Sequence, residues 1–123
     1  MHPEPRAAST HRALVLVVER DPHILLLEQY FLEQAGYRVE FASDGVQGLK
    51  AAQILRPRIV IAEILLPGLD GLCVCRGIKS DPATRDIPVV LFSILLAADR
   101  ARAAGADAFL HKPLDDQLLI RTV

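Results

Sequence analysis

The sequence predicts an α/β fold in which a parallel sheet lies between two layers of helices. Short apolar runs, each typical of a buried strand, recur along the 123-residue chain. A segment with helical periodicity follows each run. Connections long enough to hold a helix and little else require right-handed crossovers between parallel strands. We therefore expect a three-layer α/β/α sandwich built around a five-stranded parallel sheet.

The predicted strands are apolar runs too short to form free-standing helices. The first run, 13–18, is unbroken and rich in valine, which is typical of a strand covered on both faces. The second, 37–42, alternates between polar and apolar residues, as a strand does when one face is more exposed. The complete set of expected strands is 13–18, 37–42, 58–62, 88–93 and 108–110.

The predicted helices carry apolar residues at helical spacing and recognisable end signals. In the first, Ile24, Leu27, Phe31 and Ala35 recur on one face. The end signals are a proline that opens the first helix, glycines that end two helices, and polar residues that can cap the others: Pro22, Gly36, Ser43 or Asp44, Asp70, Gly105 and Asp115. The expected helices are 22–35, 44–55, 70–79, 97–104 and one from 115 onward.

The length of the chain suits one compact domain. Residues 1–12 are polar, contain proline and show no apolar periodicity, so we expect a flexible N-terminal leader. The folded domain then covers 13–123. Its last helix is short, and we expect it to be truncated from a longer protein.

Composition excludes several functional classes. A formal net charge of −1 gives no broad positive field, which disfavours direct binding of nucleic acid. No apolar run approaches the about 18 residues that a membrane span needs, so we expect no membrane segment and a cytoplasmic protein. Cys73 and Cys75 lie two apart in a predicted helix, where helix packing explains them better than a disulfide or a metal site.

Polar residues follow four of the predicted strands. Glu19 and Arg20 follow the first, Glu63 the third, Ser93 the fourth and Lys112 the fifth. Because parallel strands end at the same edge of a sheet, we expect these side chains to gather there. His23 and His111 flank the same edge and are expected to be surface residues, because no second ligand has matching spacing.

From Leu14 onward the chain resembles the receiver domains of bacterial response regulators. The matching stretches are VVERDP at 17–22, AGY at 35–37, ASDG at 42–45, IVIAE at 59–63, PGLDG at 67–71, 81–88, GADA at 105–108 and KP at 112–113. The resemblance implies a flavodoxin-like sandwich with strand order 2-1-3-4-5 and a cis peptide bond between Lys112 and Pro113.

The resemblance also implies roles for the residues at the sheet edge. In the family, two acids after strand one and an aspartate after strand three hold a magnesium ion, and the aspartate accepts a phosphoryl group from a histidine kinase. A hydroxyl residue and a lysine bind the phosphoryl oxygens, and Ser93 and Lys112 match these. The other positions depart from the pattern: Glu63 takes the phosphoacceptor place, and the acidic pair has become Glu19 and Arg20.

These departures predict an impaired centre with no catalytic residue and no bound cofactor. Arg20 removes an oxygen ligand and adds repulsion, so Mg²⁺, expected for the family, should bind weakly or not at all. Asp21 stays open as a substitute carboxylate. Glu63 is one bond too long for ordinary phosphotransfer. We expect Glu63 to pair with Arg20, Lys112 or both; in the alternative, Arg20 points to solvent and only Lys112 meets Glu63.

Two further positions correspond to residues that take part in the conformational switch of the family. Family members usually carry a small residue after the hydroxyl position and an aromatic residue in strand five that changes rotamer with it. Ile94 holds the first place and can shield the crevice as a gate. Phe109 is the switch aromatic, expected to stay fixed and inward. The stretch 93–105 is about three residues shorter than is usual, which predicts an abbreviated helix.

Two functions follow from these features. The first is a receiver domain that works as a phosphorylation-independent interaction module, with other signalling proteins or an attached output domain as partners. The resemblance also allows a homodimer through the face formed by 97–104, 108–110 and the last helix. The alternative is a magnesium-dependent receiver that a histidine kinase still phosphorylates.

Overall fold

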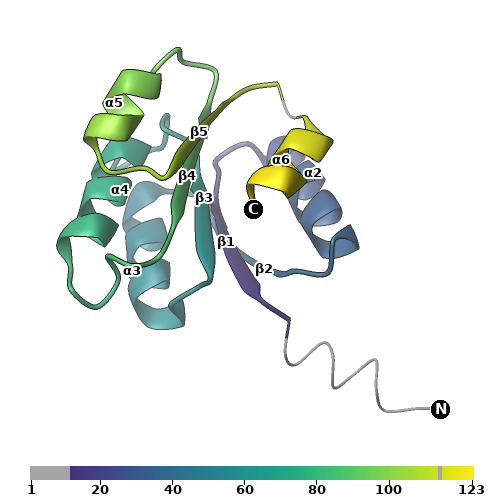
Figure 1. The fold of residues 1–123 in the computed structure, drawn as a ribbon, viewed down its shortest axis with the longest axis horizontal. Coiled ribbons are helices and arrows are strands. Elements are labelled where there is room, and N and C mark those ends of the chain that lie inside the picture. Colours follow the sequence, from purple (N-terminus) through teal and green to yellow (C-terminus); the bar gives the residue numbers. More distant parts are fainter. Residues whose placement is uncertain (1–11, 114) are drawn as a thin grey trace.

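The computed structural model describes residues 12–113 and 115–123. A five-stranded parallel sheet lies at its centre, in the order β2-β1-β3-β4-β5 (Figure 1). The strands are β1 Leu14–Val18, β2 Arg38–Ala42, β3 Ile59–Ala62, β4 Val89–Ser93 and β5 Ala108–His111. The flavodoxin-like fold and the strand order that the resemblance implies are thereby confirmed.

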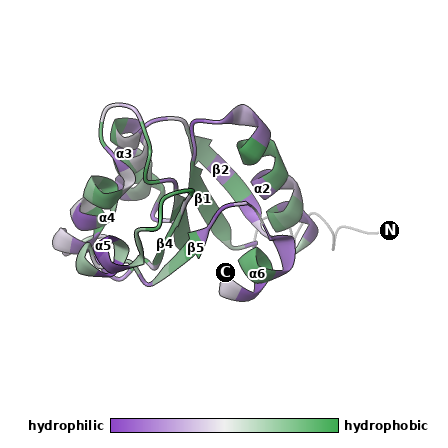
Figure 2. Ribbon diagram, turned by 90° about the horizontal axis from the view of Figure 1, so that it is seen from above, coloured by the Kyte–Doolittle hydropathy of each residue, from purple (hydrophilic) through white to green (hydrophobic). Residues whose placement is uncertain are grey.

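Two layers of helices cover the sheet (Figures 1 and 2). One layer holds α2 Pro22–Gln34 and α6 Asp116–Thr122, and the other holds α3 Gly45–Leu55, α4 Gly71–Ser80 and α5 Ala98–Ala103. Figure 2 shows hydrophobic strands enclosed between these layers. The result is the predicted α/β/α sandwich.

Alternation along each strand divides the apolar residues between two cores. In β1, Leu16 and Val18 pack on the side of α3, α4 and α5. Val15 and Val17 point the other way and share a core with Leu32 of α2. Successive side chains of a strand point to opposite faces, so an unbroken apolar run fills both cores. This is why β1 is buried along its whole length.

The predicted boundaries agree with the structure to within one residue at every helix and strand. Aspartates provide the N-caps: Asp44 accepts a hydrogen bond from the Gln47 amide at 2.8 Å, and Asp70 accepts one from Cys73 at 2.9 Å. The cap left open between Ser43 and Asp44 is therefore Asp44. Gly105 follows α5 with a φ of 93°, a conformation that glycine adopts without strain.

One expectation lies almost wholly outside what the structure describes. The expected leader, 1–12, falls on residues of which only Arg12 is described. In the described residues, no helix combines the length and apolar character that crossing a membrane requires.

Cys75 is buried in the core and Cys73 is half-buried, as expected for cysteines that pack a helix.

Helix α2 offers a matched test of this packing. Leu32→Ala removes a fully buried side chain from the core shared with β1, so we expect a loss of about 2–5 kcal/mol in the free energy of unfolding. Leu26→Ala, on the exposed side of the same helix, should change it by less than about 0.5 kcal/mol. Urea denaturation measures both values, and equal losses would contradict the assignment of the buried face.

Candidate functional site

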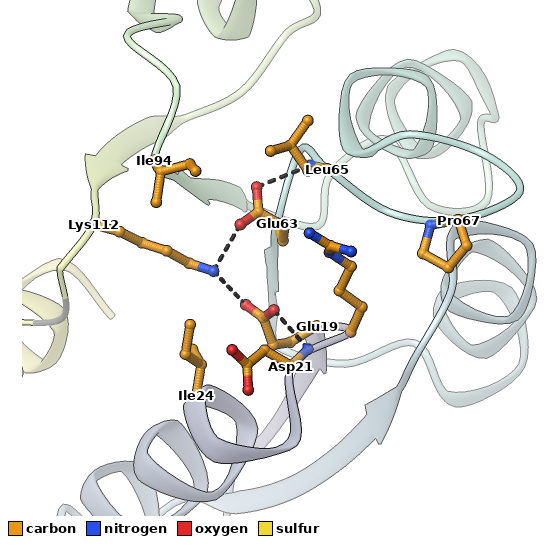
Figure 3. A pocket seen from close by; sticks show the side chains of 9 residues that line it. Glu19, Asp21, Ile24, Glu63, Leu65, Pro67, Ile94 and Lys112 are labelled. Atoms are coloured by element: carbon orange, nitrogen blue, oxygen red, sulfur yellow. Dashed lines mark hydrogen bonds and ion pairs between the residues drawn. The ribbon is translucent and has the colours of Figure 1, made fainter.

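A crevice opens at the carboxyl edge of the sheet, where the polar residues that follow the strands come together (Figure 3). Glu19 follows β1, Glu63 follows β3 and Lys112 follows β5. The lining residues are Glu19, Arg20, Asp21, Ile24, Glu63, Leu65, Pro67, Ile94 and Lys112. The sequence-based expectation that strand-end polar residues gather at one edge is confirmed for this set.

The Lys112 ammonium lies between two carboxylates at the base of this crevice (Figure 3). Its Nζ is 2.9 Å from Glu19 Oε1 and 2.6 Å from Glu63 Oε1. All three side chains are buried. The Lys112–Pro113 peptide bond is cis, as the resemblance implies. The predicted pairing of Glu63 with Lys112 is confirmed, and Glu19 joins it.

The second oxygen of each carboxylate is held by the backbone. The amide of Asp21 donates to Glu19 Oε2 at 3.0 Å, and the amide of Leu65 donates to Glu63 Oε2 at 2.9 Å. Both carboxylates are thus fixed in the same way, by a lysine on one oxygen and by the amide two residues ahead on the other. Buried charges are tolerated when hydrogen bonds replace the water that they lose.

These contacts set the protonation states of the cluster. Burial raises the pKa of Glu63, but hydrogen bonds from Lys112, the Ser93 hydroxyl and the Leu65 amide outweigh it and hold the pKa below its ordinary value. Burial lowers the pKa of Lys112, but its bonds to Glu63 and Glu19 raise the pKa above the ordinary value. Both groups are therefore charged across the neutral range.

Arg20 lies at the wall of the crevice and its side chain is exposed. Within the described part of the chain, no ion pair of 4.0 Å or less joins Arg20 to Glu63. The arrangement is therefore the alternative in which only Lys112 meets Glu63. Glu63 accepts from Lys112 on one oxygen and from the Leu65 amide on the other, so its buried charge is compensated without Arg20.

The remaining predicted site residues lie around the cluster. Ser93 is fully buried, and its hydroxyl accepts a hydrogen bond from the Leu95 amide at 3.3 Å. Ile94 lines the crevice but is 61% exposed, so it covers the opening only in part. Phe109 is half-buried against the core on the α5 side. His23 and His111 are exposed, as expected.

Sequence reasoning missed Glu28, which lies close enough to this cluster for its charges to act on Glu28. Glu28 is 1% exposed, and neither carboxylate oxygen has a hydrogen-bond partner within the described residues. The sequence did carry a signal. Glu28 is spaced four residues from Ile24 and from Leu32, which places it on the buried face of α2.

A model of the response regulator receiver domain family matches residues 15–123 of the chain. The chain belongs to this family. The receiver domain is 37% identical over 111 residues to the DNA-binding dual master transcriptional regulator RpaA of Synechocystis sp., covering 87% of this chain and 46% of RpaA. It is 40% identical over 115 residues to the response regulator PleD of Caulobacter vibrioides, covering 90% of this chain and 25% of PleD.

The chain therefore spans less than half the length of these two relatives. Among solved structures, it is similar to the receiver domain of a sensor histidine kinase from Pseudomonas aeruginosa. The TM-score is 0.83 at 27% identity, over 90% of this chain and 93% of the other. In that crystal structure a magnesium ion is coordinated in the active-site cleft.

The carboxylates of this crevice are already bound within the chain, and one of the family's acidic positions is an arginine. Mg²⁺ requires near-octahedral oxygen coordination and is usually held by carboxylates. Here Glu19 and Glu63 each give one oxygen to Lys112 and the other to a backbone amide. Asp21, the open substitute, instead caps α2 by accepting from the His23 amide at 2.9 Å. The arginine at the second acidic position adds a positive charge beside the same carboxylates.

Removing the central cation should be costly. Lys112→Met leaves two buried carboxylates facing each other, so we expect the free energy of unfolding to fall by about 3–5 kcal/mol at neutral pH. Adding Glu63→Gln to the lysine variant should recover part of this loss. Arg102→Met, which breaks the exposed pair with Asp99, should have little effect. Urea denaturation tests this, and a Lys112→Met protein as stable as the parent would refute the central role of the ammonium.

Proposed function

We propose that this receiver domain acts in two-component signalling as a protein-interaction module that does not depend on phosphorylation. The observation that carries the proposal is the make-up of the crevice, where Glu63 stands at the phosphoacceptor position, Arg20 stands at the second acidic position, and Lys112 is bound by Glu19 and Glu63. The resemblance implies that a lysine at this place binds phosphoryl oxygens, and here its ammonium is bound by two carboxylates of the chain.

The residue at the phosphoacceptor position supports this proposal. Glutamate is one carbon longer than aspartate, which moves the carboxylate relative to a phosphorus aligned for attack. A misplacement of about 1 Å can reduce a rate by on the order of 10²-fold. In addition, both oxygens of Glu63 are engaged, one by Lys112 and one by the Leu65 amide. These contacts lower the basicity of both oxygens, which weakens Glu63 as a nucleophile.

The surface beside the crevice supports a role in binding partners. Helix α5 has only six residues, as the short stretch between Ser93 and Gly105 predicts. Ile94 is 61% exposed and Leu96 is 89% exposed in the loop that precedes it. Exposed apolar side chains of this size suit contact with another protein. Other signalling proteins, or an output domain attached to this one, are the proposed partners.

Further parts of the proposal rest on the relatives. RpaA is a DNA-binding regulator. The present chain has a formal net charge of −1, which does not by itself favour binding to nucleic acid. In the proposed arrangement, contact with DNA would belong to an attached domain. A homodimer through α5, β5 and α6 and a cytoplasmic location are part of the same proposal.

Phosphorylation can be tested directly. After incubation with Mg²⁺ and a small phosphodonor, we expect the intact mass of the parent protein to stay unchanged. The double variant Arg20→Asp with Glu63→Asp restores the family's acids, so it should gain the mass of one phosphoryl group. The control, Arg20→Asp with Glu63→Asn, has no carboxylate nucleophile and should gain none.

Stoichiometric addition of one phosphoryl group to the parent protein would overturn the proposal and support the alternative of a kinase-controlled receiver. Titration with Mg²⁺ in a calorimeter provides a second measurement on the same proteins. The parent should release little or no heat of binding, whereas the Arg20→Asp, Glu63→Asp variant should bind the ion.

A further inference from the structure

Glu28 is an ionisable side chain that neither the crevice contacts nor the proposed function uses. It lies on the inner face of α2, in the same line as Ile24 and Leu32. It is 1% exposed, and within the described residues neither of its oxygens accepts or donates a hydrogen bond. A carboxylate in such a place has lost its water and gained no replacement donor.

The charged groups near Glu28 make its ionisation still less favourable. From the sheet, Glu19 and Glu63 contribute negative charge and Lys112 contributes the one positive charge. Lys112 is already bound by the other two, with distances of 2.9 and 2.6 Å. An ionised Glu28 would therefore be a third buried carboxylate beside a single ammonium.

The other elements that pack against α2 do not supply a compensating cation from a buried position. Helix α6 carries Asp116 and Arg121, and both are exposed. Strand β2 carries Arg38 and Glu40, which are also exposed. Together, burial and the negative charges of Glu19 and Glu63 raise the pKa of Glu28 to about 8, although Lys112 opposes the shift.

We propose that Glu28 is a proton-binding site beneath the crevice, occupied in the folded domain at neutral pH, and that loss of this proton loosens α2 from the sheet and disturbs the Lys112 cluster. The neutral acid form can remain between α2 and the core. The anion must gain water, and it gains water most directly if α2 moves away from the sheet. The inference goes beyond the proposed function, because it holds whether or not Glu63 accepts phosphate.

The sign of the pH dependence follows from linkage. The pKa of Glu28 is about 8 in the folded domain, against an ordinary value of 4.5. Between these values the folded state binds a proton that the unfolded state does not. Raising the pH therefore favours unfolding, by about tenfold in the folding equilibrium constant for each pH unit. The stabilisation that the bound proton gives to the folded domain is full below pH 4.5, falls as the pH rises, and is lost above the folded pKa.

The first experiment compares the pH dependence of unfolding in the parent and in Glu28→Gln. Urea denaturation from about pH 5 to 9 should give a folding constant that falls more steeply in the parent, by about tenfold per unit up to the folded pKa. Glu33→Gln, which changes an exposed glutamate of the same helix, should keep the parent's slope. Equal slopes in the parent and Glu28→Gln would overturn the proposal.

The second experiment needs no substitution at Glu28, so it remains decisive if Glu28→Gln does not fold. Carbon-13 NMR of the glutamate side-chain carboxyls follows the titration of Glu28 in the parent protein. A midpoint well above the ordinary glutamate value supports the proposal, and a midpoint near that value overturns it. In Glu63→Gln, which removes a negative charge nearby, the midpoint of Glu28 should fall; an unchanged midpoint would overturn the coupling to the crevice.

Discussion

The Lys112 ammonium, held between Glu19 and Glu63, is the interaction on which the crevice depends. Three charged side chains are buried at one edge of the sheet, and charges so placed are stable only when their hydrogen-bonding groups are satisfied. The residues that satisfy these groups come from three separate parts of the fold. The ends of β1 and β3 carry the acids, and each is fixed by the amide two residues further on. The turn after β5 carries the lysine.

This arrangement sets the charge that any ligand of the crevice would meet. Two carboxylates share one ammonium, and Arg20 adds an exposed positive charge at the wall. A divalent cation would compete with Lys112 for the same two carboxylates, beside the positive charge of Arg20. A phosphoryl group would meet Glu63, whose oxygens are both engaged. The proposed independence from phosphorylation therefore follows from the same contacts that stabilise the buried charges.

The sequence predicted the helices and strands almost completely, because each signal acts locally, whereas the strand order came from the family resemblance. Apolar runs define the strands, and Asp44 and Asp70 set helix starts through contacts three residues away. It also predicted which polar residues meet, since strand ends share an edge. It did not decide between Arg20 and Lys112 as partner of Glu63, because that choice depends on where two long side chains from different elements lie in space, which no local pattern encodes. Glu28 was missed although its spacing marks a buried face.

Glu28 and the Lys112 cluster belong to one electrostatic system. The cluster is stable because its acids find donors, and Glu28 has no donor within the described residues, so its protonation depends on how much negative charge the cluster leaves uncompensated. In the proposed function, neither metal nor phosphate changes the charge of the crevice, since Arg20 and Glu63 stand in place of two of the family's acids. Ionisation of Glu28 is then the reversible change of charge that lies nearest to the crevice. A receiver domain with these residues would respond to pH and not to phosphate. The response would be a movement of α2, and not a change in the surface beside α5.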